Sequence, residues 1–160
     1  MRLRKANLND FETFKPLYED KDEKYQWLFF FNDREEKEYQ KGVEDYKDLL
    51  ELADEEYKNF TLDKFEQHLK YNKVFMVVEK QKIIGTISLS QIARGIYRIL
   101  EWSMVEQNDE QKVAILEQIK KSFKIRELES MAFSSKAQKF LTDNQFKKIE
   151  KCFFSLKVED

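Results

Sequence analysis

Residues 74–89 read VFMVVEKQKIIGTISL, and this stretch decides the fold class. Apolar and β-branched residues recur with a period close to two on both sides of Lys80-Gln81-Lys82, a pattern typical of two strands joined by a polar turn. A third run of the same kind, over 96–105, follows across Ala93-Arg94-Gly95. The sequence therefore predicts an antiparallel meander with strands over 74–79, 83–89 and 96–105.

After the meander, the chain alternates helix and strand. Four apolar residues fall on one face of a helix predicted over 109–124, namely Val113, Leu116, Ile119 and Phe123. The run 128–133 reads as a strand, and a strand–helix–strand unit places it beside the strand before the helix. A helix over 136–141 and a strand over 151–158 follow. Cys152 is expected to be an inward structural thiol, because no basic partner that would generate a thiolate is identifiable.

Before the meander, one strand and then helices are predicted. Residues 2–6 alternate as a strand, and Asn9 or Asp10 is a candidate N-cap for a helix over 11–18. The apolar stripe of a helix over 35–57 favours a core face over a partner groove. Thr61 caps another helix that ends near residue 71. His68 on this helix is expected to be exposed and inert.

Length and composition limit the function classes. The 160 residues predict a single domain over 1–160. One Cys and one His allow neither an intramolecular disulfide nor a Cys/His zinc cluster, so no metal is expected. No apolar run is long enough to span a bilayer, and we expect a cytoplasmic protein without a membrane partner. A pI of 5.7 argues against a nucleic-acid partner.

Charge is distributed unevenly along the chain. Residues 1–72 hold 13 basic and 19 acidic side chains, a net −6, and residues 73–160 hold 16 and 12, a net +4. A basic half suits an anionic ligand and an acidic half a cationic one, although a solvated surface explains the same pattern.

The element order β-α-α-β-β-β-α-β-α-β resembles that of the GNAT acetyltransferase superfamily. The opening, residues 2–6 with Asp10 four residues later, is similar to the family's common opening. Residues 134–146, SSKAQKFLTDNQF, resemble the family segment Asn-x-x-Ala-(x)-x-Leu-Tyr-x-x-x-Gly-Phe in register. Ala137, Phe140 and Phe146 keep its character, whereas Ser134, Leu141 and Gln145 replace the usual Asn, Tyr and Gly. The likeness covers nearly the whole chain in element order, but only these two stretches at residue level.

The resemblance implies an α/β (α+β) acyl-CoA N-acyltransferase fold, with a mixed, mostly antiparallel central sheet flanked by helices and acetyl-CoA as cosubstrate. The family's phosphate loop, Arg/Gln-x-x-Gly-x-Gly/Ala, corresponds to residues 107–112, where both glycines are absent. Glu110 places a carboxylate there that would repel a phosphate, and Lys112 would offset part of that repulsion. The cosubstrate contacts implied in this way are Met104, Val105, Gln107, Glu110, Gln111, Lys112, Ser134, Ala137 and Phe140.

Of these contacts, the main chain of Met104 and Val105 would bind the pantetheine arm if their strand splays from the next one. Acetyl transfer to an amine also needs a base. Glu101 is the candidate that the family's usual position implies, and the other interpretation is a carboxylate on the solvent face beside Arg98. Leu141 cannot donate the proton that the family's Tyr gives to the leaving thiolate.

The favoured function is an N-acetyltransferase in which a small-molecule or peptidyl amine attacks the thioester directly. Acidic clusters near residues 19–23 suggest that this amine is cationic. The alternative is a catalytically inactive GNAT-fold binding or regulatory module that offers the helix over 35–57 to a partner. An unrelated α+β structural protein would lack splayed strands. The aromatic residues of 27–31 suit an acceptor pocket or core packing, and the oligomeric state, a homodimer included, is left open.

Overall fold

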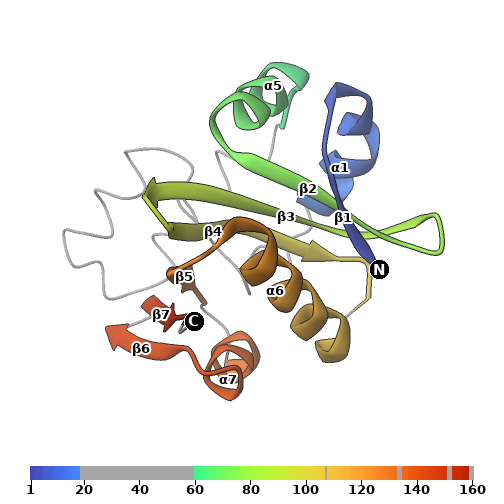
Figure 1. Ribbon diagram of the computed structural model, residues 1–160. Helices are drawn as coiled ribbons and strands as arrows, with labels where there is room; N and C mark the ends of the chain where they lie inside the picture. Colours follow the sequence, from blue (N-terminus) through green and yellow to red (C-terminus); the bar gives the residue numbers. More distant parts are fainter. Residues whose placement is uncertain (19–59, 107, 133–134, 151–152, 159–160) are drawn as a thin grey trace.

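A seven-stranded sheet organises the described part of the molecule, which in this computed structural model is residues 1–18, 60–106, 108–132, 135–150 and 153–158. The strand order is β1-β2-β3-β4-β5-β7-β6 (Figure 1). Only β4 and β5 pair in parallel, and the other neighbours pair antiparallel, so the predicted mixed, mostly antiparallel sheet is confirmed. The strands are β1 (Arg2–Lys5), β2 (Lys73–Glu79), β3 (Lys82–Ala93), β4 (Ile96–Met104), β5 (Glu127–Met131), β6 (Lys147–Glu150) and β7 (Phe153–Lys157).

Helices cover both faces of the sheet. They are η1 (Leu8–Asp10), α1 (Phe11–Tyr18), α5 (Leu62–Tyr71), α6 (Asp109–Phe123) and α7 (Ser135–Asp143). In Figure 1, α1 and α5 lie on the opposite side of the sheet from α6. Phe14 of α1 and Phe65 of α5 pack with ring centroids 4.8 Å apart, and on the other face Phe75 of β2 meets Phe123 of α6 at 5.4 Å. None of the helices in the described residues is long and apolar enough to cross a membrane.

The meander forms as its sequence predicts. Lys80 and Gln81 join β2 to β3 with φ of 51° and 66°, the left-handed conformation that a two-residue type I′ hairpin turn requires at both positions. Gly95, with φ of 77°, makes the turn from β3 to β4. After β4, α6 crosses over to β5, and the parallel pairing of β4 with β5 confirms the predicted strand–helix–strand unit.

One prediction about local structure was wrong, and one strand was not predicted. The first helical segment is capped by Asn7, whose side chain accepts from the Asn9 N–H, and Asp10 returns a bond to the Asn7 N–H in a capping box. Sequence reasoning also missed the edge strand β6, because KKIE carries little apolar pattern. The predicted helix over 35–57, the aromatic residues of 27–31 and Cys152 lie outside the described residues.

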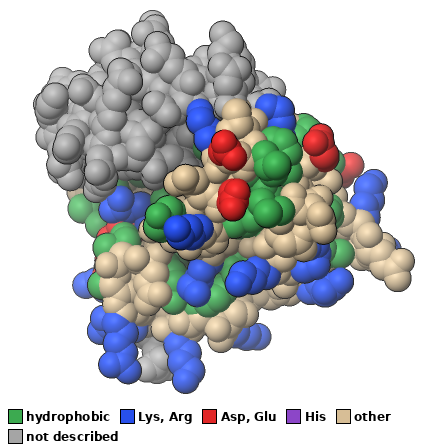
Figure 2. All heavy atoms as spheres, turned by 90° about the horizontal axis from the view of Figure 1, so that it is seen from above, with side chains coloured by type: hydrophobic (Ala, Val, Ile, Leu, Met, Phe, Trp, Pro, Cys, Tyr) green, Lys and Arg blue, Asp and Glu red, His purple; other side chains and the backbone are tan. Residues whose placement is uncertain are grey.

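The surface over α1 and α5 carries mixed charge. Seen from that side, Lys and Arg side chains are scattered among carboxylates, hydrophobic side chains and other surface (Figure 2). Arg4 of β1 and Asp10 of η1 form an ion pair at 2.8 Å.

Candidate active site

β4 and β5 separate after a short paired segment. Their parallel register consists of Ile96 with Glu127, Tyr97 with Leu128 and Arg98 with Glu129, and β4 then continues to Met104 without a partner on β5. Arg98 and Glu129 also form an ion pair at 3.1 Å, where the paired segment ends. The predicted divergence of these two strands is confirmed. We call the unpaired edges of β4 and β5 beyond Arg98 and Glu129 the β4–β5 gap.

The main chain of Met104 faces the β4–β5 gap. The Val105 N–H donates to the Ile84 carbonyl at 2.9 Å, which makes Val105 and Ile84 a hydrogen-bonded pair of the antiparallel ladder. Because such pairs alternate along a strand, Met104, which lies opposite Gly85, directs its N–H and C=O away from β3. Of the two residues predicted to offer their main chain, Met104 therefore points toward the gap, whereas the Val105 N–H is used within the sheet.

The N-terminus of α6 is occupied by its own cap. Asn108 Oδ1 accepts from the Gln111 N–H at 3.1 Å, and the Asn108 carbonyl accepts from the Lys112 N–H at 3.1 Å. The Gln111 side chain turns to β2 and donates to Glu79 at 3.1 Å. Asp109 and Glu110 are exposed in the first turn. An anion that approached this helix end would meet two carboxylates before it reached the remaining backbone N–H groups.

A hollow of about 410 Å³ lies between α6 and α7, and it is lined by Asp109, Glu110, Val113, Phe140, Asp143 and Asn144. Ala137 and Phe140 of α7 are buried, and the Phe140 ring meets the Trp102 ring of β4 at 5.8 Å. Lys112 is only 3% exposed, with its Nζ 5.7 Å from the centroid of the Phe140 ring. Its ammonium thus lies over an aromatic face between the two helices, and three of the residues that line the hollow are carboxylates.

Glu101 lies buried in a cluster of hydroxyl groups on the α1 and α5 side of β4. Thr86 donates to Oε1, Ser88 donates to Oε2 at 2.7 Å, and Ser103 also hydrogen-bonds the carboxyl. Burial raises the pKa of Glu101, and the three hydrogen bonds oppose that rise. The cluster adjoins a β-bulge, because Ser88 pairs with Glu101 while Leu89 pairs with Ile99. The interpretation of Glu101 as a carboxylate on the solvent face is wrong.

His68 belongs to the same cluster, and its predicted exposure is also wrong. The side chain is buried, and Nε2 lies 2.9 Å from Ser88 Oγ. Nδ1 lies 3.0 Å from the Asn72 amide nitrogen at the C-terminal end of α5. Burial lowers the pKa of His68 to about 3, so this ring stays neutral at physiological pH.

Solved structures with the same architecture are acetyltransferases. An N-acetyltransferase PaiA from Thermoplasma acidophilum, solved with coenzyme A, is 17% identical, with a TM-score of 0.62 over 98% of each chain. An acetyltransferase from Thermus thermophilus is 12% identical, with a TM-score of 0.62 over 98% of this chain and 96% of the other. A probable acetyltransferase from Staphylococcus epidermidis is 13% identical, with a TM-score of 0.60 over 99% of each chain. No protein-family model and no curated protein sequence matches the chain.

The chain has the GNAT fold. Within the GNAT fold, the predicted residues fall into three groups. Glu101 and Met104 lie on β4, Glu110 and Gln111 lie in the first turn of α6, and Lys112 of α6 lies over the ring of Phe140 on α7, the helix on which Ala137 is also buried. Gln107 and Ser134 lie outside the described residues.

Sequence reasoning missed the polar cluster around Glu101 in this GNAT fold, in which Thr86 and Ser88 bond the carboxyl and His68 bonds Ser88. Thr86 and Ser88 alternate with Gly85 and Ile87 along β3, and this polar face of an otherwise apolar strand is a signal that a buried polar group lies nearby. His68 follows the buried Phe65 by three residues on α5, which puts the two side chains on one helix face. Either spacing could have indicated the cluster.

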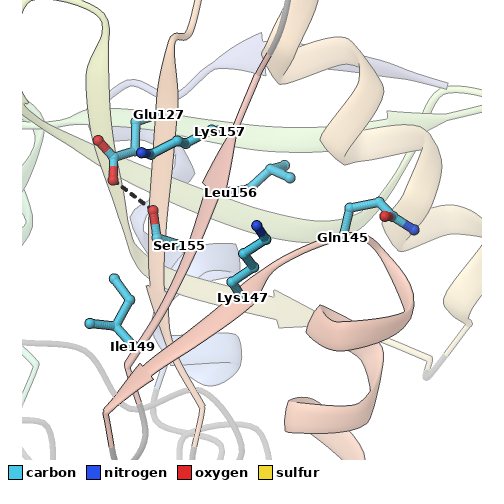
Figure 3. Close-up of a pocket in the computed structure, with 7 residues that line it drawn as sticks. All are labelled: Glu127, Gln145, Lys147, Ile149, Ser155, Leu156 and Lys157. Atoms are coloured by element: carbon cyan, nitrogen blue, oxygen red, sulfur yellow. Dashed lines mark hydrogen bonds between the residues drawn. The ribbon is translucent and has the colours of Figure 1, made fainter.

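A second hollow, of about 600 Å³, lies at the other end of β5 from the β4–β5 gap. Lys147, Lys157, Ser155 and Glu127 are among its lining residues, and Ser155 donates to Glu127 at 2.6 Å (Figure 3). Glu127 pairs with Ile96 at the start of β4. None of the residues predicted for catalysis or cosubstrate binding lines it.

Proposed function

We propose that this protein is an acetyl-CoA-dependent N-acetyltransferase in which an amine attacks the thioester directly. The observation that supports it best is the divergence of β4 from β5 beside a buried carboxyl group, Glu101, on β4. One strand then serves both substrates, since Met104 offers main-chain groups to the donor and Glu101 offers a proton acceptor to the amine.

The residues present fit the pantetheine arm of the donor better than its phosphates. Main-chain groups of Met104 face the β4–β5 gap, and Ala137 and Phe140 provide apolar packing near it. The phosphate end would meet Asp109, Glu110 and Asp143, and the Gln111 N–H is already bound by the Asn108 side chain. We therefore expect acetyl-CoA to bind weakly for a ligand of its size.

The role proposed for Glu101 is that of the general base. Acetyl-CoA supplies the thioester whose acetyl group is transferred. An amine must lose its proton before it attacks the thioester. Burial raises the pKa of Glu101, which makes its carboxylate a stronger proton acceptor. Leu141 is buried and has no hydroxyl group, so we assign protonation of the leaving thiolate to water.

The acceptor is proposed as a small or peptidyl amine, with a cationic one favoured by the acidic first half of the chain. Cytoplasmic location and a homodimer stay predictions.

The second candidate function is a GNAT-fold binding or regulatory module without turnover. The exposed carboxylates of Asp109 and Glu110 at the start of α6 favour it, because they oppose a bound pyrophosphate, whereas Asp143 is paired with Lys139 at 2.7 Å.

Two experiments test the proposal. The first is thermal unfolding with and without acetyl-CoA, and the second is an assay of free thiol release with a panel of diamines, polyamines and lysine peptides. A donor present at about 100 times its dissociation constant adds roughly 2.7 kcal/mol of stability, which raises the unfolding midpoint by several degrees. We expect Glu101→Gln to keep this shift and to lower kcat by about 100-fold or more. An unchanged midpoint at millimolar acetyl-CoA would reject the enzyme and favour the module.

A further inference from the structure

We propose that His68 is a positioning residue for Glu101, which it reaches through Ser88. His68 donates its Nε2 proton to Ser88 Oγ, and this directs the Ser88 hydroxyl proton onto the Glu101 carboxylate. The catalytic meaning of this arrangement rests on the proposed role of Glu101 as base, whereas the arrangement itself does not.

The direction of each hydrogen bond follows from what its partners can donate. An ionised Glu101 only accepts, so the single Ser88 proton goes to Oε2, 2.7 Å away. Ser88 Oγ must then accept from His68 Nε2, at 2.9 Å, which places the proton of the neutral ring on Nε2. Nδ1 is left as an acceptor, and the Asn72 amide, 3.0 Å away, donates to it. All three bonds therefore point toward the carboxylate.

Asn72, at the end of α5, holds the imidazole ring of His68, which begins the series of hydrogen bonds from His68 through Ser88 to Glu101. The Asn72 N–H donates to the His68 carbonyl at 3.0 Å, so the residue that ends the helix also holds the imidazole. Phe14 of α1 packs against the ring, with centroids 5.9 Å apart. With its ring held on two sides, His68 keeps Nε2 aimed at β3, which fixes the tautomer as well as the orientation.

A serine–histidine nucleophile is a different interpretation of the same three residues, and the geometry opposes it. A nucleophilic serine gives its proton to the histidine, and a carboxylate orients the far side of the ring. Here the carboxylate is bonded to Ser88 itself, and an amide occupies the far side of the ring. The series is therefore arranged to stabilise a charge on Glu101, which is what a general base requires before it accepts a proton.

Polar groups from β3, β4 and α5 surround Glu101 in the described part of the chain. From β3 it faces Thr86 and Ser88, from β4 it faces Ser103, and from α5 His68 reaches it through Ser88. Among the described residues, His68 is the titratable side chain in this series, and burial lowers its pKa to about 3. It therefore acts above pH 4 as a fixed neutral donor.

The test measures the pKa of the Glu101 carboxyl directly, by the pH dependence of its side-chain ¹³C resonance, with the signal assigned by its loss in Glu101→Gln. The variants are Ser88→Ala, which removes the hydroxyl, His68→Leu, which removes the donor, and His68→Gln, which keeps an N–H near the position of Nε2. We expect Ser88→Ala and His68→Leu to raise the pKa of Glu101 by about one unit, and His68→Gln to leave it within about half a unit.

A pKa in His68→Leu equal to that of the native chain overturns the inference, and so does an equal rise in His68→Gln and His68→Leu. If His68→Leu does not fold, His68→Met, which also lacks the donor, takes its place with the same expected rise, and no rise in His68→Met or in Ser88→Ala overturns the inference. In an active enzyme, the acid limb of kcat/KM moves with the carboxyl pKa. Absence of turnover together with the expected pKa changes rejects the proposed function and supports the positioning.

Discussion

Gly85 allows β3 and β4 to approach closely beside the β4–β5 gap. A Cβ at this position would lie 2.6 Å from Met104 Sδ and 2.6 Å from the Ser103 carbonyl oxygen, and the second of these is backbone that cannot turn aside. We expect Gly85→Ala to lower the free energy of unfolding by about 1–3 kcal/mol, the usual cost of forcing extra volume into a packed site. Urea unfolding measures this directly.

Ser90→Ala, on the same strand but outside the close approach, is the matched control and should change stability by less than about 0.5 kcal/mol. Equal effects of the two substitutions would show that the strands relax around a Cβ at residue 85. If instead Gly85→Ala folds with the expected loss and binds acetyl-CoA more weakly, the close approach also sets the position of the Met104 main chain.

Single residues mark the limit of what the sequence could predict about the site. Glu101 could be assigned to a strand, but its burial depends on Thr86, Ser88 and Ser103 lying around it, and no local pattern states that. His68 was predicted to be exposed and inert on its helix. The tertiary contact with β3 overrides that local signal, since a ring that bonds Ser88 on one side and Asn72 on the other has its polar atoms satisfied when buried.

At the scale of the element, the proposed phosphate site at the start of α6 can be tested by its charge. Glu110 is exposed there and lines the hollow between α6 and α7. Two like charges about 4 Å apart in water cost about 1 kcal/mol. We therefore expect Glu110→Gln to lower the dissociation constant of acetyl-CoA about fivefold, as measured by isothermal titration calorimetry.

Glu117→Gln is the control on the same helix. Glu117 is exposed and pairs with Lys120 at 2.9 Å, two turns away from the helix start, so its substitution should leave the dissociation constant unchanged. A dissociation constant that Glu110→Gln does not alter would mean that the phosphates lie elsewhere than at the start of α6. Loss of Glu110 also weakens the favourable interaction with the helix dipole, by about 0.3–1 kcal/mol of stability.

Elements with strong periodicity were predicted well, and those fixed by their neighbours were not. The hairpin, α5 with its Thr61 cap, and α6 followed by a parallel strand all appear as predicted. β6 was missed because an edge strand of Lys147–Glu150 pairs on one side only and needs little apolar surface. The bulge between Ser88 and Leu89 comes from pairing register, which no single strand encodes.

At the scale of the whole molecule, the two buried groups of the site affect stability in opposite directions. Burial lowers the pKa of His68 from 6.5 to about 3, so below pH 6.5 the unfolded chain takes up a proton that the folded chain does not. Stability is therefore lost as the pH falls. Burial raises the pKa of Glu101 above 4.5, so between 4.5 and the raised value the folded chain holds the extra proton. That stability is lost as the pH rises.

These opposed effects predict that the native chain loses less stability than Glu101→Gln when the pH falls from 6.5 to 4.5, and that two variants diverge. Glu101→Gln leaves only the histidine, so its free energy of unfolding should fall on acidification with a slope that approaches about 1.4 kcal/mol per pH unit. His68→Gln leaves only the carboxyl, so its free energy of unfolding should hold or rise over the same interval. Asp10 does not interfere, because its pKa lies below 3.8. Burial raises that pKa, but hydrogen bonds from Arg4 and the Asn7 N–H lower it by more. Urea unfolding at half-unit steps of pH measures all three slopes, and equal slopes in the two variants would contradict the burial of one group or the other.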